Sequence, residues 1–364
     1  MAEQIQRYFQ HLVQELAALS PYAAPLKTLY LGGGTPSLLP PEAVSLCLEL
    51  LHREFELSSL QEWTLEVNPE HTEPEALARW VAGGVNRVSL GVQSFDNEVL
   101  TRCGRLHQQG HIYTAVERIR EAGINNWSLD LMYALPGQTL AQWRETLDRA
   151  VALAPQHVSL YALEIHPRTR FGFENIPDFS EDLAGEMYEL ACETLGKAGY
   201  VHYEIANFCQ PGFASQHNQV YWQTRPFLAA GVGAHGYLQG RRYETPRELR
   251  AYYAQCDARC WNWQTTKAQT EAEAVEEFMF LGLRQLARGI VFSEFEARFG
   301  HPLATYYPQC LPELLQQKYL LPTERGLRLA PEAVGLSNRI FAEFLDPCVP
   351  GPTLPEMVQS DITC

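Results

Sequence analysis

The chain has 364 residues, of which 46% are hydrophobic and 20% charged, a balance that supports a buried core and excludes wholesale disorder. Its 28 Lys and Arg residues against 43 Asp and Glu residues give a net charge of −15, which argues against a nucleic-acid backbone as the main partner. No apolar run approaches the ~18 residues that span a membrane, and the amphipathic N-terminus does not resemble a signal peptide, so we expect a soluble, cytoplasmic protein without a transmembrane segment.

The first part of the chain predicts helices and strands in alternation. It begins with an amphipathic helix over residues 1–19. Strands are then predicted at Thr28–Leu31, Trp63–Val67, Arg87–Val92, Ser128–Met132 and Val158–Ile165, and helices at Glu42–Phe55, Pro74–Ala82, His111–Ala122 and Leu140–Leu153. This alternation is typical of right-handed βαβ units around a parallel sheet, so we predict an α/β fold, specifically a partial (β/α) barrel.

The pattern changes near residue 265. Helices are predicted at Thr270–Leu286, Phe292–Phe299, Leu311–Lys318 and Ser337–Phe344, with a short hairpin at Leu320–Leu329. This order resembles a winged helix, although an acidic chain without a basic recognition helix favours a lid or docking domain over DNA binding. We therefore predict a barrel with its extension over residues 1–264, a C-terminal helical, winged-helix-like domain over 265–346, and a polar tail over 347–364.

The nine cysteines are scattered and do not form a disulfide framework. Only Cys256 and Cys260 lie close together, four residues apart. No third cysteine or nearby histidine completes a ligand set, so we predict that both occupy one face of a helix.

Polar residues follow the predicted strands, where parallel sheets and barrels gather their chemistry. Gly32, Gly33 and Gly34 precede Thr35 at the end of the first strand, and this turn can bring backbone N–H groups close to a ligand. Glu66, Gln93, Asp130 and Glu164 lie at or near the ends of later strands. One such residue could be an ordinary loop residue or cap, but four on successive strands favour a shared cavity.

Asp130 interrupts an otherwise apolar strand. Because burial of an unpaired carboxylate costs several kcal/mol, it needs a partner. We leave open whether that partner is a protein group, such as Arg87 or Arg105, or the hydroxyl groups of a ligand ribose.

The segment from Gln216 to Trp222 is a compact polar and aromatic cluster. In a helix, His217 and Tyr221 would share one face. An imidazole among aromatic rings suits a flat ligand or an axial ligand to haem iron, but taken alone it is more often a packing residue.

Taken together, these segments resemble the oxygen-independent coproporphyrinogen III oxidase family of radical S-adenosylmethionine proteins, and most closely its HemW-type haem chaperone branch. The resemblance covers nearly the whole chain and rests on the following segments in order: LYLGGGTPSLL, LEVNPE, NRVSLGVQSFD, GRLH, SLDLMYALPGQT, YEIANF, HNQVYW and GAHGY.

The resemblance implies two sets of site residues. Gly33, Gly34 and Thr35 would contact the methionine end of S-adenosylmethionine, and Glu66, Gln93, Arg105 and Asp130 would contact the rest of that cofactor. Haem, the cargo, would be bound by the HNxxYW segment, through His217 with Asn218, Tyr221 and Trp222. The haem would pass to an acceptor protein that the sequence does not identify.

One family motif is missing from the sequence. The family has a Cys-x3-Cys-x2-Cys motif after its first strand, whose thiolates hold a [4Fe–4S] cluster, and no such triplet occurs here. The predicted strand at Thr28–Leu31 would also have an uncovered edge, which natural proteins usually avoid. We therefore expect the radical-SAM-type barrel to lack its first strand, with that strand and the motif lying ahead of Met1. The alternatives are an oxygen-independent coproporphyrinogen III oxidase and a binding protein without a cluster.

Overall fold

The structure, a computed structural model, describes residues 2–165, 171 and 180–350. The chain divides into two units, one made of Met1–Tyr221 and Arg225–Lys267, the other of Trp222–Thr224 and Ala268–Cys364. The domain ranges expected from the sequence stay a prediction, and residues 351–364 of the expected tail lie outside the described residues. Among the residues described, no helix is both long and apolar enough to cross a membrane.

The first unit contains a seven-stranded sheet in the order β1-β2-β3-β4-β5-β7-β6. Strands β1 to β5 are parallel, which confirms the predicted parallel sheet, and β1 lies at its edge. The two remaining strands, which the sequence did not reveal, pair antiparallel at the other side. The strands are β1 (Thr28–Leu31), β2 (Glu62–Val67), β3 (Arg87–Gln93), β4 (Asn126–Tyr133), β5 (His157–Ala162), β6 (Val201–Glu204) and β7 (Asn207–Cys209).

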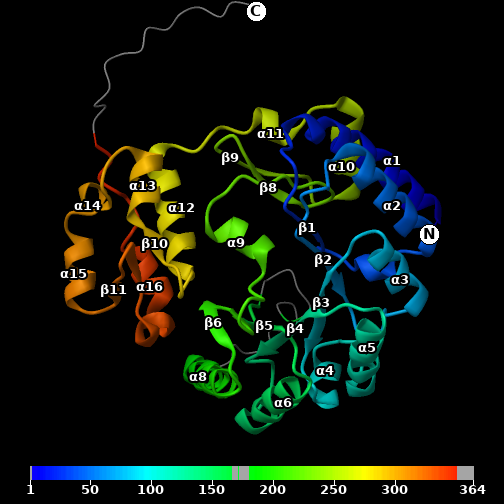
Figure 1. Cartoon of the computed structure of the whole chain (residues 1–364), viewed down its shortest axis with the longest axis horizontal. Helices are drawn as coiled ribbons and strands as arrows, with labels where there is room; N and C mark the ends of the chain where they lie inside the picture. The colour runs from blue at the N-terminus through cyan, green and yellow to red at the C-terminus, as the bar shows by residue number, and fades with distance from the viewer. Residues whose placement is uncertain (1, 166–170, 172–179, 351–364) are drawn as a thin grey trace, which may run out of the picture. The chain divides into compact units, whose positions relative to one another are not determined.

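Helices line the outer side of this sheet (Figure 1). They pack there because the strands place apolar side chains on that face: Trp63, Leu65 and Val67 of β2, for example, are at most 2% exposed. The helices of this region are α1 (Ala2–Leu19), α2 (Pro41–Glu54), α3 (Pro74–Ala82), α4 (Asn97–Arg102), α5 (Gln109–Glu121), α6 (Leu140–Ala152) and α8 (Glu181–Lys197). The sequence predicted all of these except α4 and α8.

The rest of the first unit follows β7. Its elements are α9 (Gln216–Trp222), β8 (His235–Leu238), β9 (Arg241–Glu244), α10 (Leu249–Ala258) and α11 (Asn262–Thr265). Helix α9 lies on the concave side of the sheet, opposite the outer helices (Figure 1).

The prediction that Cys256 and Cys260 share a helix face is wrong. Helix α10 ends at Ala258, and Arg259 adopts a left-handed conformation with φ of 50°. Cys256 is therefore buried within the helix, whereas Cys260 is exposed beyond its end.

The second unit is mainly helical and contains the predicted hairpin, formed by β11 and β12. Strand β10 pairs with β12 to complete a three-stranded sheet. Its elements are α12 (Glu271–Arg284), β10 (Ile290–Val291), α13 (Phe292–Phe299), α14 (Leu303–Tyr306), α15 (Cys310–Gln316), β11 (Leu320–Pro322), β12 (Gly326–Leu329) and α16 (Ser337–Ala342).

Candidate functional site

The face of the sheet opposite the outer helices is polar. Side chains alternate along a strand, so the residues between the apolar ones point to the other face. They are Glu62, Thr64 and Glu66 of β2, Arg87 and Ser89 of β3, Ser128 and Asp130 of β4, and His157 and Ser159 of β5. Most of these are buried, and hydrogen bonds connect them, so this face is a continuous polar surface.

Glu66 holds the glycine turn that follows β1. Its Oε2 accepts a hydrogen bond from the backbone N–H of Gly33 at 3.0 Å, and its Oε1 accepts one from the Tyr30 hydroxyl at 2.6 Å. A Cβ on Gly32 would lie 2.6 Å from both Tyr30 and Glu66, so only glycine allows this close approach. Gly33 has φ of 82°, and around both Gly33 and Gly34 there is open space. Glu66 therefore holds the turn on one side, and the space around Gly33 and Gly34 on the other side is open.

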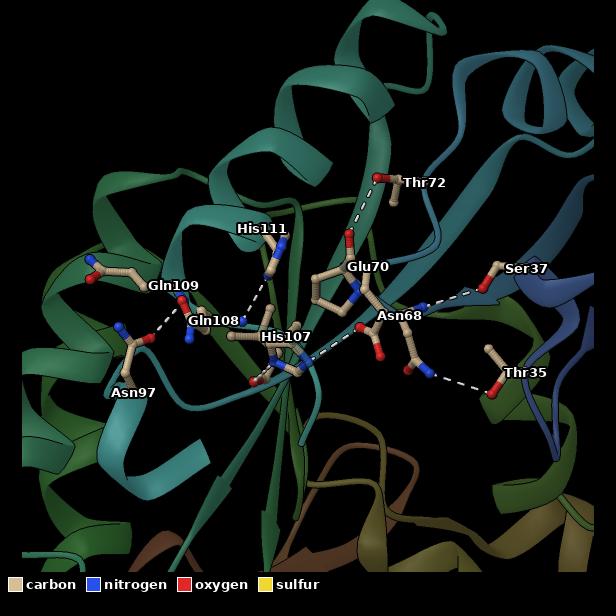
Figure 2. Close-up of polar contacts among 12 residues, drawn as sticks. Thr35, Ser37, Asn68, Glu70, Thr72, Asn97, His107, Gln108, Gln109 and His111 are labelled. Atoms are coloured by element: carbon tan, nitrogen blue, oxygen red, sulfur yellow. Dashed lines mark hydrogen bonds and ion pairs between the residues drawn. The ribbon is translucent and has the colours of Figure 1, made fainter. Parts of the chain in front are cut away.

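Asn68, after β2, links to the far end of this turn. Its Nδ2 donates to Thr35 Oγ1 and its backbone N–H donates to Ser37 Oγ, each at 3.4 Å, as Figure 2 shows. Thr35 is therefore positioned by a residue at the carboxyl end of the neighbouring strand.

Asp130 is bound by hydroxyl groups rather than by an arginine in direct contact. Ser89 Oγ donates to one carboxylate oxygen at 2.8 Å and Ser128 Oγ to the other at 3.3 Å. Burial raises the pKa of Asp130, although hydrogen bonds from Ser89 and Ser159 and the positive charge of Arg87 oppose the shift. Of the two arginines considered from the sequence, Arg87 is the one whose charge acts on Asp130.

Gln93 ends β3 in an unusual conformation. Its φ is 61°, and the pairing of β3 with β4 shifts register between Gly91 and Gln93, which indicates a β-bulge. Gln93 is only 7% exposed, yet within the part of the chain that the structure describes its Oε1 accepts no hydrogen bond. A buried acceptor without a donor is costly, so this atom is suited to a ligand.

Arg105, another predicted cofactor residue, has Glu70 as the carboxylate whose charge acts on it. It is exposed on the segment between α4 and α5. Glu70 also lies 3.4 Å from Nδ1 of the buried His107, whose Nε2 contacts the carbonyl oxygen of Val92 at 3.1 Å (Figure 2).

The predicted helix at HNQVYW is α9, and its first turn is held by a distant carboxylate. Glu62 of β2, 3% exposed, accepts hydrogen bonds from the backbone N–H groups of Gln216 and His217, both at 2.9 Å, and from Ser215 Oγ at 3.2 Å. Ser215 Oγ also accepts from the N–H of Asn218 at 3.3 Å, so it caps the helix. A carboxylate at a helix N-terminus is favourable because the helix dipole is positive there.

His217 is half-buried on the concave side of the sheet. Its Nδ1 lies 2.9 Å from Thr28 Oγ1 and its Nε2 lies 2.6 Å from the Tyr221 hydroxyl. The ring of Tyr30 stacks on the imidazole with centroids 5.2 Å apart. Burial, and to a lesser extent the charge of Arg87, lower the pKa of His217 to about 4, so the imidazole is neutral at physiological pH.

Trp222 is the last residue of α9 and is assigned to the second unit, and its predicted role beside His217, Asn218 and Tyr221 stays a prediction. In the second unit, the guanidinium carbon of Arg284 lies 4.7 Å from the centre of the Trp222 ring.

The predicted cofactors differ in how well they fit the described residues. The unsatisfied Oε1 of Gln93, the carboxylates of Glu66 and Asp130, and the open glycine turn suit a ligand rich in N–H and O–H groups, such as S-adenosylmethionine. The [4Fe–4S] cluster does not fit, because the described residues include no group of three or more His, Cys, Asp or Glu side chains able to hold a metal ion.

Comparison with known proteins is consistent with this architecture. A family model of the radical SAM superfamily matches residues 4–150, and a model of the HemN C-terminal domain matches residues 269–336. Proteins named heme chaperone HemW are similar over nearly the whole chain. That of Lactococcus lactis is 35% identical, covering 94% of this chain and 90% of its own, and that of Bacillus subtilis is 34% identical, covering 94% and 92%.

A solved structure shows the same fold. Coproporphyrinogen III oxidase (HemN) from Escherichia coli, described as a radical SAM enzyme, superposes with a TM-score of 0.78 at 23% identity. The match covers 94% of this chain and 83% of that one.

Proposed function

This chain belongs to the family of the HemW heme chaperones, within the radical SAM superfamily, and from that premise we propose that it binds haem and transfers it to an acceptor protein. The observation that carries the proposal is the 35% identity to a HemW protein over more than nine-tenths of this chain.

We assign haem binding to His217. Only a neutral imidazole offers a lone pair to iron, and the low pKa of His217 keeps it neutral. The rings of Tyr30 and Tyr221, at centroid distances of 5.2 and 5.0 Å from the imidazole, provide an aromatic environment that suits a flat ligand.

We further propose that S-adenosylmethionine binds along the strand ends. The glycine turn, with Gly33, Gly34 and Thr35, would receive its amino-acid end, while Glu66 and Asp130 would accept hydrogen bonds from its hydroxyl groups and Gln93 Oε1 from an N–H or O–H group. Radical SAM proteins use this cofactor with a [4Fe–4S] cluster. Because the described residues do not fit the cluster, the proposed function includes no step that depends on it.

The oxidase alternative has weaker support. At 23% identity, the match to the coproporphyrinogen III oxidase HemN shows the fold alone. The proteins named HemW are more similar in sequence and match over nearly the whole chain.

Haem titration of the full chain tests the proposal. We expect one haem per chain, and His217→Ala should weaken binding by about tenfold or more, which corresponds to about 1.4 kcal/mol. His235→Ala is the matched control, since the side chain of His235 is 61% exposed in the same unit. Unchanged haem affinity in His217→Ala would contradict the role of His217, and absence of stoichiometric binding by the wild type would contradict the function. Conversion of coproporphyrinogen III under anaerobic conditions would instead support the oxidase alternative.

A further inference from the structure

Both ring nitrogens of His217 are already engaged by hydroxyl groups. Thr28, the first residue of β1, contacts Nδ1, and Tyr221, one helical turn beyond His217 on α9, contacts Nε2. At 2.9 and 2.6 Å both distances are typical of hydrogen bonds. Neither hydroxyl was predicted from the sequence to contact the imidazole in this way.

The relative acidity of the two hydroxyl groups sets the direction of these bonds. A neutral imidazole has one N–H and one lone pair. The Tyr221 phenol is intrinsically more acidic than the Thr28 alcohol, so it is the better donor of the two. The phenol therefore donates to Nε2, and Nδ1–H donates to Thr28 Oγ1. This tautomer presents a lone pair on Nε2, the nitrogen covered by Tyr221.

Resting on the proposed haem-binding role of His217, we propose that Thr28 and Tyr221 are positioning residues of the haem site. Thr28 fixes the imidazole in the form whose Nε2 can bind iron. The Tyr221 hydroxyl occupies the position that iron takes when haem binds.

Replacement of the Tyr221 hydroxyl by iron at Nε2 requires no proton transfer. The hydrogen bond between the Tyr221 hydroxyl and Nε2 breaks, and a bond from Nε2 to iron forms. Tyr221 keeps its proton, and His217 keeps its hydrogen on Nδ1, still bonded to Thr28. A hydrogen bond from Nδ1–H to a neighbouring acceptor also fixes the orientation of a ligating imidazole and increases its basicity.

The surroundings favour rotation of Tyr221 over movement of His217. Glu62 holds the backbone N–H groups of residues 216 and 217, and Tyr30 stacks on the imidazole. Tyr221 lies one turn farther along α9, with its ring 4.6 Å from that of Phe227 in an edge-on contact. The imidazole is thus fixed by a carboxylate, a ring and Thr28.

Haem titration of full-chain variants tests the two roles separately. Tyr221→Phe removes the competing hydroxyl and keeps the ring, so we expect haem to bind about two- to tenfold more tightly. Thr28→Val removes the acceptor for Nδ1–H and should weaken haem binding by about tenfold or more, whereas Thr28→Ser should restore it. Tyr113→Phe is the matched control, since Tyr113 is 37% exposed and bonds only weakly, at 3.4 Å, to Gln109.

Two spectroscopic measurements distinguish positioning from a structural role. In the haem-free protein, ¹⁵N resonances of His217 should show the hydrogen on Nδ1. In the ferrous haem complex, Thr28→Val should lower the iron–histidine stretching frequency, and Thr28→Ser should leave it near the wild-type value.

Several results would overturn the inference. They are a hydrogen on Nε2 of His217, equal or weaker haem binding by Tyr221→Phe, and equal haem affinities for the valine and serine variants of Thr28. Failure of the wild type to bind haem would instead refute the proposed function, and in that case the haem-free ¹⁵N spectrum still tests the tautomer.

Discussion

Replacement of Glu62 by Gln should loosen α9 while leaving the shape of the buried side chain almost unchanged. The amide oxygen can take the place of Oε1, which accepts from His217 N–H and Ser215 Oγ. The amide NH₂ would then face the N–H of Gln216, which now donates to Oε2 at 2.9 Å. Two donors would oppose each other at a site where the residue is 3% exposed.

The expected loss follows from these contacts. Leaving the buried N–H of Gln216 without an acceptor costs about 1–3 kcal/mol. The hydrogen bonds from His217 N–H and Ser215 Oγ, now to a neutral acceptor, each weaken by about 1 kcal/mol. Removal of a buried charge offsets part of this, so we expect a net loss of about 2–4 kcal/mol in the free energy of unfolding. For a unit of this size, each kcal/mol lowers the melting temperature by about 2–4 °C.

Thermal unfolding and amide hydrogen exchange measure this effect. Glu62→Gln should lower the melting temperature by at least about 4 °C and speed exchange in residues 216–222. Glu193→Gln is the control, because Glu193 forms an exposed pair with Lys197 on α8, and loss of an exposed pair changes stability little. If Glu62→Gln melted and exchanged like the wild type, the carboxylate would not stabilise α9.

Two further predictions concern acid stability and the second unit. The pKa of His217 is about 4 in the folded protein and ordinarily near 6.5, so the unfolded chain takes up the proton first as pH falls. Its contribution to stability should be complete above pH 6.5 and lost as pH falls towards 4. In urea unfolding at a series of pH values, the free energy of unfolding should therefore fall less steeply between pH 6.5 and 4 for His217→Phe than for the wild type. Equal pH dependence in the two proteins would contradict the lowered pKa of His217. In the second unit, a Cβ on Gly326 would lie 1.9 Å from the carbonyl oxygen of Ile290, whereas one on Gly335 would meet nothing within 4 Å. We expect Gly326→Ala to lose about 2 kcal/mol or more by denaturant unfolding and Gly335→Ala to lose much less, and equal losses would contradict the close packing of β10 on β12.

The sequence predicted the elements that have a regular pattern. Strands β1 to β5 and, except for the short α4, the helices between them were found because their apolar residues recur with the period of a strand or helix. Strands β6 to β9 were missed because each has only three or four residues and, unlike the equally short but mostly apolar β1, shows no apolar run. Cys260 was misplaced because the helix end depends on the left-handed conformation of Arg259, which the local residue types do not signal.

The site was predictable where its residues lie at strand ends and unpredictable where contacts are long-range. Glu62 lies more than 150 positions before the helix that it caps, so local sequence could not reveal their contact. A signal was nevertheless present: the alternation of polar and apolar residues in EWTLEV predicts a second, polar face of the sheet. The partners of Asp130, Ser89 and Ser128, follow from the same alternation on β3 and β4.

The polar face of the sheet also has a consequence for protein abundance. Any ligand that binds there only in the folded state adds to stability by mass action, about 2.7 kcal/mol at a free concentration 100 times its dissociation constant. A substitution on this face that removes only a ligand contact can then leave the melting temperature of the purified, ligand-free protein unchanged while it removes that added stability inside the cell. Degradation acts on the unfolded fraction, so such a variant would be recognised first by its low steady-state level.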